Sequence, residues 1–151
     1  MDSDVMREIE RRLYLYPMIE NEVAMLACEY DEEYSLQAVS FHDKAFIART
    51  NKFYSQVEQA ILRNDRYDEV TKETIRAKIR ISSAIQALYL IHREIITMHY
   101  FDGLKFIAVA ARLDRSTTYV YDRRMEALKR LEAMNVHLVP LGSFKDKHGL
   151  S

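Results

Sequence analysis

Glycine and proline are scarce in this 151-residue chain, which contains three glycines and two prolines. Both residues interrupt regular secondary structure, and nearly half of the residues are apolar. This composition excludes a low-complexity linker and predicts a folded, all-α chain. The length suits one domain, or a small domain with a helical appendage.

Cysteine and long apolar runs are also missing. Cys28 is the single cysteine, so an intrachain disulfide is excluded and a reducing compartment is expected. No apolar run approaches the ~20 residues that a membrane-spanning helix needs. The N-terminus MDSDVMREIERR is acidic where a signal peptide is basic and then apolar. We therefore expect a cytoplasmic protein without a membrane partner.

Recognisable catalytic motifs are the third absence. The sequence has no glycine-rich phosphate loop and no serine elbow. Its five histidines fall at no metal-ligand spacing, and a lone cysteine cannot complete a site. His99, among Met98, Tyr100 and Phe101, is interpreted as a hydrogen-bonded core histidine. We expect no enzyme, no cofactor and no metal.

Charge is balanced overall at −1 but is unevenly distributed. Residues 1–40 contain three basic and ten acidic side chains, a net of −7. Residues 41–131 contain 17 basic and 11 acidic side chains, a net of +6. An acidic end joined to a basic body is typical of nucleic-acid contact, although solvated helix faces can give the same imbalance.

The N-terminal half predicts helices over 4–15 and 18–30, separated at Tyr16-Pro17, because the residue before proline avoids helical geometry. They can form an antiparallel pair or one kinked rod. Residues 31–45 are interpreted as a connection. A helix is predicted over 46–64, through Phe46, Phe53, Val57, Ala60 and Ile61.

A turn at NDRYD (64–68) and a long helix over 71–91 follow, with apolar residues on two of its sides. We interpret 1–66 as an N-terminal helical region for oligomerisation or a partner. Residues 67–131 form a helix-turn-helix domain with a connector helix, and 132–151 form a C-terminal tail or a loosely docked strand.

The segment 105–131 has the features of a helix-turn-helix. A short alanine-rich helix is predicted over 105–112, with an apolar face, and Asp114-Arg115 leave room for a tight turn. Ser116 is a favoured N-cap residue. A second helix follows, with the apolar stripe Val120, Ala127, Leu128 and Leu131.

The opposite side of this second helix, with Thr118, Tyr119, Asp122, Met125 and Lys129, is predicted to face solvent, with Thr117 and Tyr121 at its margins. Small or planar hydrogen-bonding groups near a helix N-terminus suit base edges in the major groove, and basic side chains suit phosphates. Arg124 projects onto the buried stripe, so we expect its stem on apolar surface and its head in solvent. The candidate DNA-binding residues are Lys105, Arg115, Ser116, Thr117, Thr118, Tyr119, Tyr121, Asp122, Arg123 and Arg124. Two ordinary packed helices with a solvated charged face are the alternative.

The stretch DGLKFIAVAARLDRSTTYVYDRRMEALKRL resembles the promoter-reading helix-turn-helix of sigma factors, their region 4. It shares an acidic-Gly-Leu entry, the Val109-Ala110 pair, a leucine before the turn, a serine after it and a terminal Ala-Leu. REIITMHYFDG (93–103) is similar to the preceding helix of that domain. Arg115, where an aliphatic residue is common, and the adjacent arginines 123 and 124 depart from the pattern.

The chain contains no candidate for a promoter-melting region. Together with its N-terminal helix ending in LYLYP, it resembles the RinA/ArpU group of phage late-gene regulators. That resemblance implies a sequence-specific activator of phage or prophage packaging and lysis genes that binds promoter DNA and can contact RNA polymerase. A sigma-like factor acting through RNA polymerase and a small terminase subunit are the alternatives. A homo-oligomer through the N-terminal helices would favour DNA half-sites ~34 Å apart, or a multiple.

Overall fold

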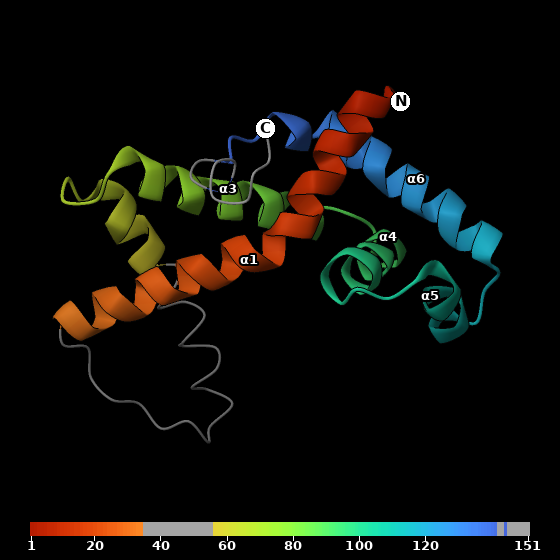
Figure 1. Ribbon diagram of the computed structural model, residues 1–151, viewed down its shortest axis with the longest axis horizontal. Coiled ribbons are helices and arrows are strands. Elements are labelled where there is room, and N and C mark those ends of the chain that lie inside the picture. Colours follow the sequence, from red (N-terminus) through yellow and green to blue (C-terminus); the bar gives the residue numbers. More distant parts are fainter. Residues whose placement is uncertain (35–55, 142–143, 145–151) are drawn as a thin grey trace, which may run out of the picture.

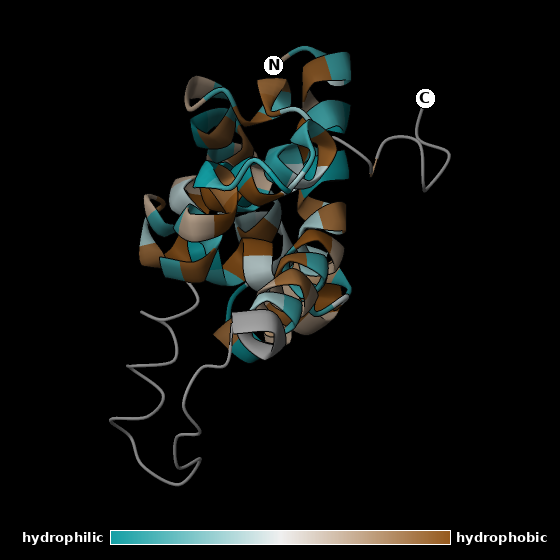
Figure 2. Cartoon of the chain, turned by 90° about the vertical axis from the view of Figure 1, so that its left-hand side faces the viewer, coloured by the Kyte–Doolittle hydropathy of each residue, from teal (hydrophilic) through white to brown (hydrophobic). Residues whose placement is uncertain are grey.

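The computed structural model describes residues 1–34, 56–141 and 144, and these form helices and turns without a β-strand (Figure 1). The all-α prediction is confirmed for these ranges. No helix among them is long and apolar enough to cross a membrane. Apolar and polar residues are mixed on the helices, as expected for amphipathic helices packed on shared cores (Figure 2).

Helix α1 spans Ser3–Tyr34 and contains Pro17. The predicted interruption at Tyr16-Pro17 is therefore wrong, and of the two arrangements the single rod is observed. The ribbon changes direction between its two halves, as expected where proline removes a backbone N–H and crowds the preceding turn (Figure 1). Leu13, Tyr16 and Ile19 on both sides of Pro17 are buried, so packing maintains the helix through the proline.

The N-terminal helical region continues with a helix over 56–63 that buries Val57 and Ile61. The rest of the predicted 46–64 helix, including Phe46 and Phe53, lies outside the described residues. Of the predicted connection over 31–45, residues 31–34 instead belong to α1. The predicted turn at 64–68 is confirmed.

Helix α3 spans Glu69–Gln86, and the side chain of Asp68 caps it by accepting a 2.8 Å hydrogen bond from the Thr71 amide. The predicted helix over 71–91 is too long, since the chain turns at 87–89 and α4 spans Leu90–Ile96. Leu88 lies buried in that turn. The chain changes direction at this turn, and α4 does not continue the axis of α3.

After α4 comes the π-helical turn η1, Thr97–Phe101, and then a loop in which Gly103 adopts φ +73°. A positive φ costs least for glycine, which has no Cβ, so Gly103 suits this position before the next helix. Tyr100 of η1 is buried. Helices α5 (Phe106–Leu113) and α6 (Thr117–Ala133) follow at the end of the basic segment 41–131.

The largest core gathers side chains from α1, α3 and α6. Ile9, Leu13 and Ile19 of α1 are fully buried, as are Leu128 and Leu131 of α6. The acidic N-terminal helix thus packs directly on α3 and α6, which lie almost entirely in the basic segment 41–131.

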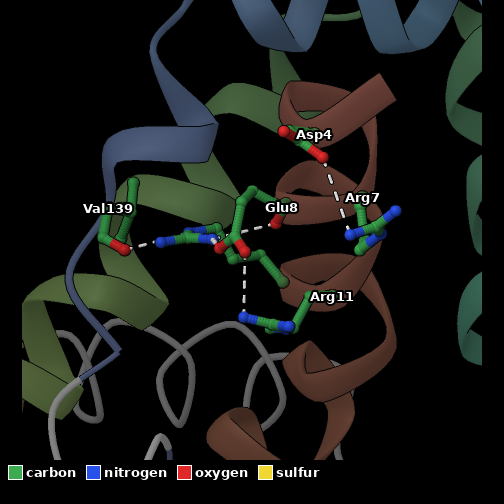
Figure 3. Close-up of polar contacts among 6 residues, drawn as sticks. Asp4, Arg7, Glu8, Arg11 and Val139 are labelled. Atoms are coloured by element: carbon green, nitrogen blue, oxygen red, sulfur yellow. Dashed lines mark hydrogen bonds and ion pairs between the residues drawn. The ribbon is translucent and has the colours of Figure 1, made fainter. Parts of the chain in front are cut away.

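The C-terminal segment closes this core. After α6, the short 3-10 turn η2 (Val136–Leu138) leads to Val139 and Leu141, which are buried together with Phe144. The Nε of Arg12, a residue only 8% exposed, donates a 2.9 Å hydrogen bond to the Val139 carbonyl (Figure 3). The described residues of the predicted tail are therefore docked on α1, with a 3-10 turn and no strand.

The same arginine is held in place from α1 itself. Glu8 accepts from Arg12 at 2.7 Å and from Arg11 at 2.9 Å, and Asp4 lies 3.6 Å from Arg7 (Figure 3). Because Glu8 restrains the Arg12 guanidinium, little further side-chain entropy is lost when it binds the Val139 carbonyl.

Candidate nucleic-acid interface

Helices α5 and α6 are joined by a turn of three residues, Asp114 to Ser116. Asp114 adopts the left-handed conformation, with φ 53° and ψ 48°. The Arg115 amide donates a 3.0 Å hydrogen bond back to the Ala110 carbonyl. A left-handed residue with such a backward bond is a common way to end a helix, and aspartate adopts this conformation more readily than most non-glycine residues. The predicted tight turn is confirmed.

Ser116 begins α6 as predicted. Its Oγ accepts a 3.1 Å hydrogen bond from the Tyr119 amide, three residues ahead. The cap satisfies one of the free N–H groups at the helix start, and the others point toward solvent or a ligand. Ser116, Thr117 and Thr118 are all exposed. The positive end of the α6 dipole is therefore accessible.

A second, smaller core fixes the angle between the two helices. It contains Ile95 of α4, Val109 and Ala110 of α5, and Val120 of α6, all buried. Ala110 contributes only a methyl group to this core, so little side-chain bulk separates α5 from α6 there. The predicted stripe on α6, Val120, Ala127, Leu128 and Leu131, is buried throughout.

Seven of the ten candidate residues are exposed in the structure, and Tyr119, Arg123 and Arg124 are partly buried. The exposed ones are Lys105, Arg115, Ser116, Thr117, Thr118, Tyr121 and Asp122. Met125, predicted on the solvent side, is partly buried and packs on the large core. The exposed candidate residues of α6 thus lie in its first two turns, and Lys129, also predicted on the solvent side, is exposed further along the helix.

The guanidinium groups of Arg115 and Arg123 both lie over the ring of Tyr119. The Arg115 guanidinium carbon lies 5.1 Å from the centre of the Tyr119 ring, and that of Arg123 lies 5.4 Å from it. A cation over an aromatic face is attracted by the ring quadrupole, worth about 0.5–1 kcal/mol at an exposed site. The ring therefore restrains both charges beside the start of α6, one from the turn and one from the helix.

Arg123 also has a carboxylate partner. Its Nη2 lies 3.0 Å from Glu126 Oε1, and the other oxygen of Glu126 lies 3.0 Å from His92 Nε2 on α4. His92 is buried, so Glu126 links α6 to the interior of the domain. Arg123 is consequently less available to a ligand than Arg115.

Arg124 differs from the expectation most clearly. Its head was predicted to reach solvent, but Nε donates a 2.8 Å hydrogen bond to the Tyr100 hydroxyl and Nη2 one of 3.0 Å to Glu10 Oε2. The Tyr100 hydroxyl in turn donates to the same Glu10 oxygen at 3.0 Å. Burial raises the pKa of Tyr100, against the lowering effect of Arg124, so the phenol keeps its proton and donates. Arg124 therefore joins α6 to α1.

The aromatic rings of His99, Phe106 and Tyr121 lie next to one another where η1, α5 and α6 meet. Phe106 lies 3.9 Å from the His99 ring and 4.6 Å from the ring of Tyr121, measured between ring centroids. His99 is hydrogen-bonded as expected, through Nδ1 to the Leu104 carbonyl at 2.8 Å and through Nε2 to the Tyr14 hydroxyl at 3.3 Å. The Phe106 ring therefore restrains the exposed side chain of Tyr121.

Sequence reasoning left out one basic residue of this surface. Arg112, in the last turn of α5, is exposed and lies three residues before Arg115. The signal was available, because Arg112 follows the buried Val109 and Ala110 on the outer side of the helix. Among the described residues, no three His, Cys, Asp or Glu side chains gather into a metal-binding group.

A comparison with known protein families, with curated proteins and with solved structures finds no match. The function proposed for this surface therefore depends on its geometry, its charge and the sequence resemblance.

Proposed function

We propose that the chain is a sequence-specific DNA-binding transcriptional regulator in which α5 and α6 act as a helix-turn-helix. The N-terminal end of α6 enters the major groove, where Thr117, Thr118 and Tyr121 meet base edges. The observation that carries the proposal is the serine-capped, exposed start of α6, with Arg115 and Arg123 restrained on Tyr119 beside it.

The charged groups divide into two roles. Arg115, Lys105 and Arg112 are exposed near the turn and are suited to phosphates on either side of the groove. The exposed N–H groups at Ser116 and Thr117 favour a phosphate oxygen at the same place. Asp122, one turn further along α6, is repelled by phosphates, so it fits best opposite a cytosine amino group.

The finer proposal, an activator of phage or prophage late genes, rests on the resemblance to the RinA/ArpU group. RNA polymerase is the expected partner of an activator, and homo-oligomers of the chain would place two reading heads on one promoter. Arg124 is left out of the proposed DNA contacts because Glu10 and Tyr100 already bind it.

The first test is a gel-shift titration against tiled fragments of the neighbouring genome at two salt concentrations. One retarded fragment at both salts is the expected result. Thr118→Ala should weaken that complex about tenfold, the lower range for one lost base contact. Arg115→Ala should weaken all fragments alike and reduce the salt slope by about 0.9, as for one lost phosphate contact.

Arg76→Ala is the matched control, because Arg76 is an exposed arginine on α3, away from the proposed interface. It should leave affinity and salt slope unchanged. Uniform retardation that vanishes at higher salt would reduce the proposal to backbone attraction. The absence of any shift, with binding to core RNA polymerase in a pull-down, would favour the sigma-like alternative. A large ring in sedimentation would favour the terminase subunit.

A further inference from the structure

The C-terminal half of α1 has a second apolar side that faces solvent. Its exposed residues Met18, Asn21, Met25 and Cys28 are named here the methionine face. They are spaced three, four and three residues apart, so they lie on one side of the helix. At about 1.5 Å per residue they extend over about 15 Å. Met18 is 44% and Met25 58% exposed. The opposite side of the same half-helix is buried in the core.

The surroundings of the methionine face carry one sign of charge. Residues 13–34 contain six carboxylates and no lysine, arginine or histidine. Glu22 follows Met18 by four residues and Glu29 follows Met25 by four, so both carboxylates lie beside the methionines on one flank of the helix. The face is thus an apolar strip with an acidic rim, on a chain whose basic residues lie mostly after residue 41.

We propose that the methionine face binds a basic amphipathic helix of a partner protein. Apolar side chains of such a helix would cover Met18 and Met25, whose unbranched thioethers adapt to irregular partners. Lysines or arginines flanking its apolar stripe would meet Glu22 and Glu29.

A second copy of this chain fits the same face poorly. Two methionine faces brought together would place four carboxylates, Glu22 and Glu29 from each copy, beside one small apolar contact. Like charges across an interface oppose association, and no basic residue of 13–34 can compensate them. This proposal stands independently of the proposed DNA-binding function.

The test is calorimetric titration of the full chain with a synthetic helix of about 18 residues, leucines on one face and lysines on the other. A peptide of identical composition with the leucines spread around the helix is the control ligand. One-to-one binding of the amphipathic peptide alone, weakening as salt rises, is the expected result. The Met18→Gln, Met25→Gln double variant should lose about tenfold in affinity. The Glu29→Gln variant should lose part of the salt dependence.

Val70→Gln is the matched protein control, since Val70 is an apolar residue of α3 with 47% exposure. It should bind the peptide like the unmodified chain. Circular dichroism of each variant confirms that the helices persist, which is expected because the changed side chains are exposed.

Cys28 reports where the peptide binds. It is the single cysteine of the chain and lies exposed in the methionine face. Bound peptide should slow its alkylation by N-ethylmaleimide several-fold, and the control peptide should not. Equal affinity of the methionine variant, an unprotected Cys28, or no binding would each overturn the proposal. So would a dimer in sedimentation that the methionine variant converts to monomer, because a second copy would then be the occupant.

Discussion

Replacing Glu10 should destabilise the whole domain, because Glu10 is the only carboxylate that contacts Arg124 among the described residues. The side chains of Arg124 and Glu10 are 14% and 21% exposed. With alanine at position 10, the guanidinium would remain in a partly buried site with the Tyr100 hydroxyl as its main polar partner.

The expected loss of unfolding free energy lies between the values known for buried and for exposed ion pairs. Removing one member of a fully buried pair costs about 3–5 kcal/mol, and breaking an exposed pair costs about 0–1 kcal/mol. For this partly buried pair we expect Glu10→Ala to lower the free energy of unfolding by about 2 kcal/mol. In a chain of this size that corresponds to a decrease in Tm of about 4–8 °C.

Urea denaturation followed by circular dichroism measures this change. Asp4→Ala is the matched control, since Asp4 and Arg7 form an ion pair on α1 whose side chains are 80% and 69% exposed. It should leave the midpoint nearly unchanged. Adding Arg124→Met to Glu10→Ala should recover about 1 kcal/mol or more, because no unpaired charge then remains. A loss no larger than that of Asp4→Ala would refute the assigned role of Glu10.

Three further predictions concern local backbone features. Ser116→Ala should cost about 1 kcal/mol of stability, measured by urea denaturation, because the Tyr119 amide loses its cap. Gly103→Ala should lower Tm through a backbone cost of about 1 kcal/mol at φ +73°, although the added methyl group meets no atom within 4 Å. The backbone hydrogen bond from Thr71 lowers the pKa of Asp68, so its stabilisation is complete above the ordinary pKa and is lost as pH falls through the lowered value. Asp68→Asn should remove that part of the acid dependence in pH-resolved thermal melts, and an unchanged acid limb would contradict it.

Local rules predicted the candidate interface well. The bounds of α5, the turn at Asp114, the Ser116 cap and the buried stripe of α6 each depend on residues within a few positions of one another. Capping, glycine scarcity and helical periodicity act over that range. The same rules predicted the turn before α3.

The errors occur where a distant segment decides the structure. Arg124 was expected in solvent because its partners, Glu10 and Tyr100, lie 114 and 24 residues away. Pro17 was expected to end a helix, but packing of both halves of α1 on one core keeps it continuous. The break at 87–89 depends on where α4 must lie against α6. No periodicity within one helix contains such information.

The hydrogen bond from Arg12 to Val139 also constrains the order in which the chain can fold. Its partners are 127 residues apart, and Val136, Leu141 and Phe144 join the same core as Ile9 and Leu13. During synthesis α1 therefore leaves the ribosome long before its final neighbours exist. Until residue 144 emerges, part of the apolar surface of α1 has no native cover, so the fold is completed only after the C-terminal segment has left the ribosome. Ribosome profiling of chaperone contacts along nascent chains should find α1 occupied until residue 144 has emerged.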